Sequence, residues 1–150
     1  MAYKKILVAV DGSDTSTLAM QEAINLAKDQ QATLRIIYVA DAFVVVGDGV
    51  RFDFEQYENA VRGHGLSILN KMESLAHKAG VPVESGIIEN TESSTRIPEK
   101  IVQDSSAWHA DLLVIGTHGR RGFSRLVLGS VAEGIIRMAS TPVLLISGKK

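Results

Sequence analysis

The sequence has no cysteine among its 150 residues, only three prolines and 5% aromatic residues. Without cysteine, disulfide bonds, thiolate metal sites and cysteine nucleophiles are excluded. The sequence also has no excess of charge of one sign: it contains 16 Lys and Arg residues and 17 Asp and Glu residues, and the formal net charge is -1. A near-neutral chain has no overall electrostatic attraction to nucleic acid or to an anionic membrane, so neither is expected as a partner.

Long hydrophobic runs are missing as well. The apolar stretch near the N-terminus ends at Asp11, which is too short for a signal peptide core or a membrane-spanning helix. Later runs, at residues 43–46 and 143–146, have the length of strands. We therefore expect no membrane insertion and a cytoplasmic location. The chain length is typical of one domain, so a single domain over residues 1–150 is expected.

Instead of long hydrophobic runs, the sequence has a regular alternation of strand-like and helix-like segments. Continuous runs of aliphatic residues are typical of parallel strands that are covered on both faces. This pattern predicts strands at residues 6–10, 34–39, 81–88, 112–115 and 142–146, and helices at residues 15–30, 55–79, 94–109 and 131–138. The alternation predicts an α/β protein, a three-layer α/β/α sandwich with a five-stranded parallel sheet.

Several small residues mark the ends and weak points of these helices. Ser13 or Asp14 is expected to cap the first helix. Gly63 and Gly65 are expected to weaken the first half of the second helix, because glycine is a poor helix former. Pro98 is expected in the first turn of the third helix, where its missing N–H costs little.

The most informative segment is the glycine-rich stretch from Gly116 to Ser130, GTHGRRGFSRLVLGS. Backbone N–H groups in glycine turns can approach an anion closely and can reach positive φ. Ser130 opens the next helix, and helix N-termini favour phosphate. The segment therefore predicts a phosphate-bearing ligand. Ser130 and Glu133 also have the spacing of a capping box, so the hydroxyl of Ser130 is assigned equally to a cap and to a ligand contact.

Other phosphate-binding motifs are incomplete. No G-x-x-x-x-G-K-[ST] sequence occurs, and the G-x-G at Gly47 has Phe52 in place of its third glycine. A Walker ATPase and a standard Rossmann dehydrogenase are therefore not expected.

The spacing Gly-x2-Gly-x9-Gly-Ser, formed by Gly116, Gly119, Gly129 and Ser130, resembles the ATP-binding motif of the universal stress protein family. The resemblance extends over the opening ILVAVDGS, the segments IIYVAD and ADLLVIGTHGR, and the closing TPVLLI. It implies a sheet of order 3-2-1-4-5, of the adenine nucleotide α-hydrolase-like, Rossmann-like type, and a homodimer. Since every element of the glycine pattern is present, the sequence is similar to the ATP-binding branch of the family.

The resemblance also implies roles for individual residues. Asp11 is expected near the adenosine, Ala9 and Val10 beside the base, and the backbone of Val39 at the adenine edge. Gly116 is expected near the ribose and phosphates, and the later part of the motif at the phosphate chain. The full expected nucleotide-binding set is Ala9, Val10, Asp11, Ser13, Val39, Gly116, Thr117, His118, Gly119, Arg120, Gly129, Ser130 and Val131.

Each of these residues also has a structural interpretation. Asp11 can order the turn after the first strand, and His118 can be a solvated loop residue instead of a phosphate donor. The arginines near the motif can neutralise phosphate or form a basic surface; they are Arg120, Arg121 and Arg125. The remaining histidines, His64, His77 and His109, have no paired ligand spacing, so no protein metal site is expected. Trp108 is expected in the core.

No residue set in the sequence has the pattern of a catalytic base and nucleophile. We therefore expect a nucleotide-dependent regulator or stress-response module that binds ATP, with ADP and AMP as other occupants, and with Mg²⁺ held mainly by the phosphates. The alternatives are a slow ATP hydrolase of the adenine nucleotide α-hydrolase-like group and a dimerisation module without nucleotide. The edge strand Val143–Ile146 is the expected dimer contact. Residues 41–53 are expected to form a lid or a surface for an unknown protein partner.

Overall fold

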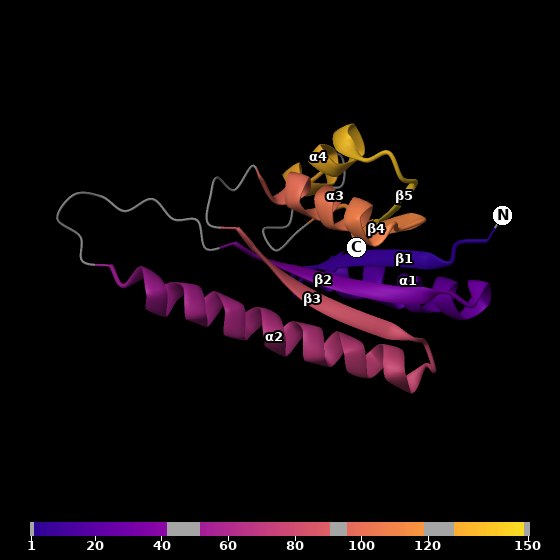
Figure 1. Ribbon diagram of the computed structural model, residues 1–150, viewed down its shortest axis with the longest axis horizontal. Coiled ribbons are helices and arrows are strands. Elements are labelled where there is room, and N and C mark those ends of the chain that lie inside the picture. The colour runs from indigo at the N-terminus through magenta and orange to yellow at the C-terminus, as the bar shows by residue number, and fades with distance from the viewer. Residues whose placement is uncertain (1, 42–51, 91–95, 119–127, 149–150) are drawn as a thin grey trace.

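A computed structural model describes residues 2–41, 52–90, 96–118 and 128–148. Strands and helices alternate through these described residues, as predicted (Figure 1). The strands are β1 (Lys5–Val10), β2 (Thr33–Asp41), β3 (Val83–Asn90), β4 (Leu112–Gly116) and β5 (Val143–Ile146). The helices are α1 (Asp14–Gln30), α2 (Phe54–Lys78), α3 (Ile97–Trp108) and α4 (Ser130–Met138).

All strand pairs are parallel, and the sheet has the order β3-β2-β1-β4-β5. Val8 at the centre of β1 is paired with Ile36 of β2 and with Val114 of β4. The predicted fold class and strand order are therefore confirmed. The strand order reverses between β1 and β4, which is where open α/β sheets bind ligands beyond the carboxyl ends of their strands. β5 lies at one edge of the sheet.

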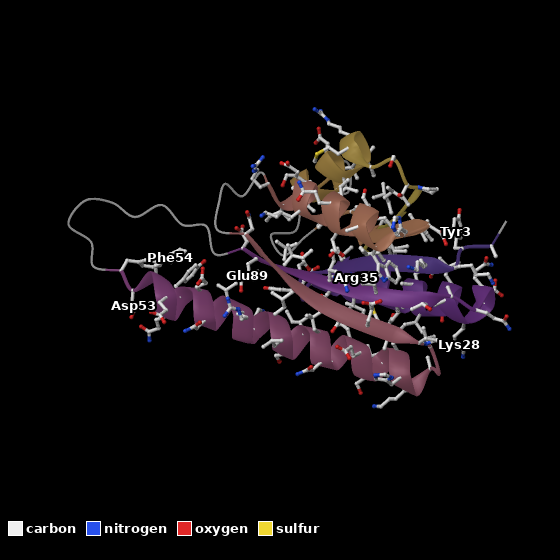
Figure 2. The ribbon with its side chains drawn as sticks, in the orientation of Figure 1. Tyr3, Lys28, Arg35, Asp53, Phe54 and Glu89 are labelled. Atoms are coloured by element: carbon white, nitrogen blue, oxygen red, sulfur yellow. The ribbon has the colours of Figure 1, made fainter. Side chains whose placement is uncertain are left out.

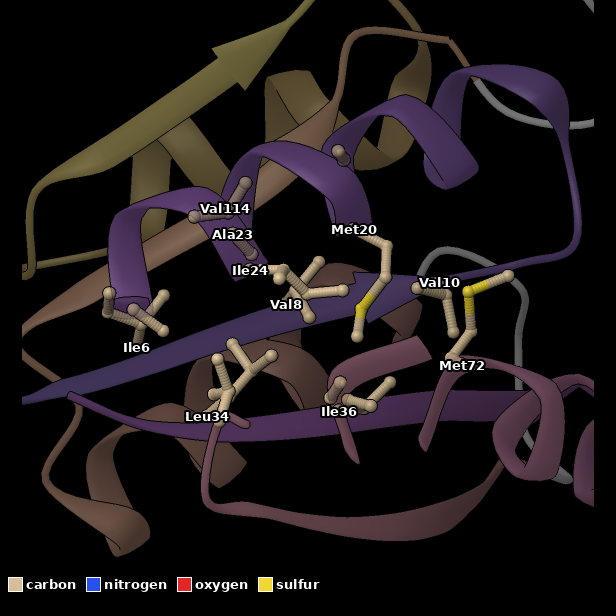
Figure 3. Packing of buried hydrophobic residues seen from close by; sticks show 14 of the residues in the cluster. Ile6, Val8, Val10, Met20, Ala23, Ile24, Leu34, Ile36, Met72 and Val114 are labelled. Atoms are coloured by element: carbon tan, nitrogen blue, oxygen red, sulfur yellow. The ribbon is translucent and has the colours of Figure 1, made fainter. Parts of the chain in front are cut away.

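The helices cover both faces of the sheet, and this explains the uninterrupted apolar strands. Successive residues of a strand point to opposite faces. Val8 packs under α1 with Met20, Ile24 and Ile36 (Figure 3), whereas Leu7 packs on the other face. The second apolar layer, under α3 and α4, contains Leu7, Ile37, Ile101, Leu113, Ile115, Ala132 and Ile135.

Most element boundaries lie within two residues of the prediction. The starts of β3 and α3, which fall two and three residues later than predicted, are set by the local backbone. β3 begins at Val83 and not at Val81, because the N–H of Val81 donates to Ala76 O and closes the end of α2. α3 begins at Ile97, with Arg96 at the N-cap position and without a side-chain cap. Pro98 lies in the first turn of α3, as predicted.

Gly65 is a point of close approach between α2 and the sheet. It is buried, and a methyl group built on it would lie 2.4 Å from Cδ2 of Tyr38 on β2. Gly63, two residues earlier, has nothing within 4 Å of such a methyl group. The two glycines that looked equivalent in the sequence therefore differ: Gly65 admits the ring of Tyr38, and Gly63 has no packing role.

Arg35 on β2 (Figure 2) joins the sheet to α3. Its Nε and Nη2 donate to the carboxylate of Asp104 at 2.8 and 3.0 Å, and its Nη1 donates to Glu84 at 3.0 Å. The hydrogen bonds with Asp104 raise the pKa of Arg35, so the guanidinium stays charged. Trp108 donates from Nε1 to Glu84 and packs partly buried against the layer under α3. This network holds α3 in place at a distance from the carboxyl ends of the strands.

Candidate functional site

The turn after β1 is held by its own side chains. Asp11 Oδ1 accepts a hydrogen bond from Ser13 N at 2.8 Å, and Gly12 between them has a φ of 86°. Ser13 is the N-cap of α1, as predicted, because its Oγ accepts from Ser16 N at 3.1 Å. The structural role considered for Asp11, ordering the turn after the first strand, is therefore observed. A ligand contact by Asp11 stays a prediction, and the turn fixes the carboxylate beside the carboxyl end of β1.

The segment after β4 is pinned by two backbone hydrogen bonds. Thr117 N donates to Ile146 O at 2.9 Å, and Gly129 N donates to Thr117 O at 2.8 Å. The second bond joins the two residues that flank 118–128 and brings the end of β4 beside the start of α4. Thr117 itself is 8% exposed, and its Oγ1 lies 2.9 Å from Nδ1 of His118. Gly116 at the end of β4 and Gly129 at the start of α4 are thus brought close together.

The start of α4 corrects the predicted capping box. Gly129 is the N-cap, with φ and ψ of -64° and 156°, and no side-chain cap is present. Ser130 is the first helical residue and is exposed, while Glu133 pairs with Arg137 at 2.9 Å. The cap interpretation of Ser130 is therefore wrong. The first N–H groups of a helix have no intrahelical acceptor, and without a side-chain cap they are suited to an anion.

Gly116 and Gly129, the two motif glycines that the structure describes, do not have positive φ, although positive φ is one reason for glycine in such a motif. Among the glycines described, positive φ occurs at Gly12 and Gly80. Gly116 still belongs to strand β4, and Gly129 has extended backbone angles. Gly119 lies outside the described residues, as do Arg120, Arg121 and Arg125. Their predicted contacts remain predictions.

The residues expected around the base divide between the two faces of the sheet. Ala9 and Val39 are partly buried in the layer under α3 and α4, together with Val131 of α4. Val10 is buried at 4% exposure in the opposite layer under α1. A ligand on the α4 side can therefore meet the side chains of Ala9 and Val39, but only the backbone of Val10.

A feature that the sequence analysis missed is a cavity of about 260 Å³ between β2 and α2. The N-terminal end of α2, near Asp53 and Phe54, extends beyond the sheet (Figure 2). The cavity lies next to it, between the following turns of α2 and the end of β2. Its lining comes from segments far apart in the sequence, so no spacing signal could have revealed it. The lining residues are Tyr38, Asp41, Tyr57, Ala60, Val61 and His64.

In the part of the chain that the structure describes, no helix is long and apolar enough to cross a membrane. Within the same ranges, no group of three or more His, Asp or Glu side chains is arranged to hold a metal ion.

Comparison with known proteins decides the family. The sequence profile described as the universal stress protein family matches residues 2–147. The chain belongs to the universal stress protein family. The resemblance drawn from the glycine spacing is thereby confirmed, and so is its implied sheet order.

Related universal stress proteins and solved structures agree with this. The universal stress protein MJ0531 of Methanocaldococcus jannaschii is 36% identical over 148 residues, which cover 99% of this chain and 84% of that protein. The structure of UspA from Lactobacillus plantarum superimposes with a TM-score of 0.84 at 23% identity, covering 97% of this chain and 99% of that one, and shows the shared fold. A universal stress protein from Archaeoglobus fulgidus, solved in complex with dAMP, has a TM-score of 0.65 at 25% identity, with coverage of 97% and 99%.

Proposed function

We propose that this universal stress protein binds ATP at the carboxyl ends of β1 and β4, as a nucleotide-dependent regulatory or stress-response module. The observation that carries the proposal is the hydrogen bond from Gly129 N to Thr117 O, which sets the Gly116 turn beside the uncapped start of α4. The Archaeoglobus fulgidus relative in complex with dAMP supports an adenine nucleotide as the ligand class.

The proposal divides the site into two halves. Asp11 accepts hydrogen bonds from the adenosine, and Ala9 and Val39 line its apolar side on the face of α3 and α4. The phosphates bind to the first N–H groups of α4 and to the glycine motif, where Gly119 and Arg120 also belong. Mg²⁺ is held mainly by phosphate oxygens and water. ADP or AMP would use the same adenosine half with fewer phosphate contacts.

The binding of ATP is tested by thermal unfolding and isothermal titration calorimetry. Because a ligand that binds only the native state stabilises it, ATP at 100 times its Kd is expected to stabilise the chain by about 2.7 kcal/mol. GTP at the same concentration is the control. It is expected to stabilise the protein less, because the hydrogen-bonding edge of guanine differs from that of adenine. Absence of any ATP effect, together with no adenine nucleotide detected by mass spectrometry in the purified protein, would overturn the proposal.

The proposal is one of binding and not of catalysis. ATP turnover by the wild-type chain is therefore expected to fall well below the enzyme range of roughly 1 s⁻¹ and above. The Asp11→Asn variant keeps the shape of the side chain and changes its charge. Turnover on the order of 1 s⁻¹ that disappears in this variant would favour the hydrolase alternative.

We propose further that the protein is a homodimer formed through β5. This strand lies at the edge of the sheet, and all four of its residues are only partly buried. An exposed apolar edge strand readily pairs with another chain, and a two-fold axis would pair it with itself. Analytical ultracentrifugation is expected to show a dimer at micromolar concentration. A monomer at that concentration would contradict this part of the proposal.

A further inference from the structure

Thr15, in the first turn of α1, packs against the residue at which β4 ends. A methyl group built on Gly116 would lie 2.7 Å from Cγ2 of Thr15, 3.3 Å from its Cβ and 3.4 Å from its carbonyl carbon. The same side chain meets the chain again after β5, since a methyl group built on Gly148 would lie 3.0 Å from Oγ1 of Thr15. One threonine therefore fills the space beside two glycines.

The contact lies on the face of the sheet opposite to α4. Along β4, Val114 belongs to the layer under α1 and Ile115 to the layer under α3 and α4. Because strand residues alternate, the position of a side chain at Gly116 points back toward α1, in agreement with the contact to Thr15. A side chain at this position would meet Thr15 and not a nucleotide at the start of α4.

We propose that Thr15 is a positioning residue of the nucleotide site, and that its Cγ2 methyl group is the reason why residue 116 is glycine. The methyl group fixes where β4 ends. Through the next peptide it fixes the Thr117 carbonyl that accepts the hydrogen bond from Gly129. The inference rests on the proposed ATP binding. It differs from the role implied by the family resemblance, in which Gly116 lies near the ribose and phosphates.

Gly116→Ala and two double variants test the inference. Gly116→Ala is expected to weaken ATP binding by about tenfold, because an overpacked strand end displaces Thr117. Adding Thr15→Ser removes Cγ2 and keeps the hydroxyl group near Gly148, and is expected to restore the affinity to within about threefold of wild type. Adding Thr15→Val keeps the methyl group and removes the hydroxyl group, so that double variant is expected to stay weak. Calorimetry measures each affinity, and thermal unfolding without ATP checks that each variant is folded.

The outcomes separate the inference from its alternatives. Wild-type affinity in Gly116→Ala would overturn it, and so would weak binding by both double variants, because the glycine would then serve the ligand side. Equal rescue by Thr15→Ser and Thr15→Val would also overturn it. If Gly116→Ala does not fold, the double variant with Thr15→Ser is expected to fold and bind, and its failure to do so overturns the inference. Absence of ATP binding by the wild-type chain is a distinct result, which overturns the proposed function and this role of Thr15 together.

Discussion

Replacing Ser130 by glutamate is expected to weaken ATP binding by about a hundredfold while the protein stays fully folded. Ser130 is exposed and is the first residue of α4. A carboxylate there is close to the proposed phosphate position, and repulsion between like charges a few ångströms apart costs about 1 to 4 kcal/mol in partly solvated surroundings. The same carboxylate interacts favourably with the helix N-terminus, by about 0.3–1 kcal/mol. Affinity and stability should therefore change in opposite directions.

The matched control for this substitution is Ser130→Gln, because glutamine has the same length and shape as glutamate but carries no charge. Its loss of ATP affinity is expected to stay below about tenfold, because it removes one hydroxyl contact at most. Calorimetry gives both affinities, and denaturant unfolding without ligand gives both stabilities. Wild-type affinity in Ser130→Glu would show that the phosphates do not bind at the start of α4.

Replacing Gly65 by alanine is expected to destabilise the protein by about 2–3 kcal/mol. The new methyl group would lie 2.4 Å from Cδ2 and 2.6 Å from Cε2 of Tyr38. Tyr38 is 1% exposed and belongs to the core cluster on this face of the sheet, so displacing its ring disturbs other buried side chains. Either α2 must shift away from β2 or the ring must leave its rotamer. Equilibrium unfolding in urea measures the change as a lower midpoint with an unchanged m-value.

Gly63→Ala provides the internal control, two residues away on the same helix. A methyl group on Gly63 has nothing within 4 Å, so alanine there is expected to stabilise the helix by about 0.5–1 kcal/mol. The two substitutions are chemically identical and have opposite expected signs. Equal effects of the two would show that helix propensity, and not the contact with Tyr38, determines the role of these glycines.

The sequence pattern predicts most of the fold because the central strands β1 and β4 are apolar on both faces. β1 and β4 read as uninterrupted aliphatic runs, and only a covered parallel sheet accommodates them. The start of β3 is less predictable. Val81 is as strand-like as Val83 in composition, but its N–H is used to close α2. Composition carries no information about where a backbone N–H is used, so boundaries of this kind need the structure.

The candidate site also combines features that the sequence predicts with features that only the structure shows. The glycine spacing and the family resemblance together indicate Gly116, Gly129 and Ser130, but the bond that joins the two ends of the segment runs between backbone atoms of Thr117 and Gly129. No pattern of side chains in the sequence predicts a hydrogen bond between two backbone groups. The sequence favours a cap and a ligand contact equally for Ser130, because Ser130 and Glu133 have the spacing of a capping box and the helix N-terminus also favours phosphate. It does not show that Gly129 takes the N-cap position. The sequence also does not predict the contact between Thr15 and Gly116. That contact depends on the face of the sheet toward which a side chain at position 116 would point.

The backbone bond between Thr117 and Gly129 has a consequence for how such a site changes in evolution. A bond between main-chain groups requires no particular side chain, so residues 118–128 can be replaced without loss of the closure. Changes in the length of a closed loop also cost little, because the entropy of closure grows only slowly with length. The fold and the proposed nucleotide site can therefore change separately in evolution: a descendant that loses glycines between residues 118 and 128 can still keep the same sheet.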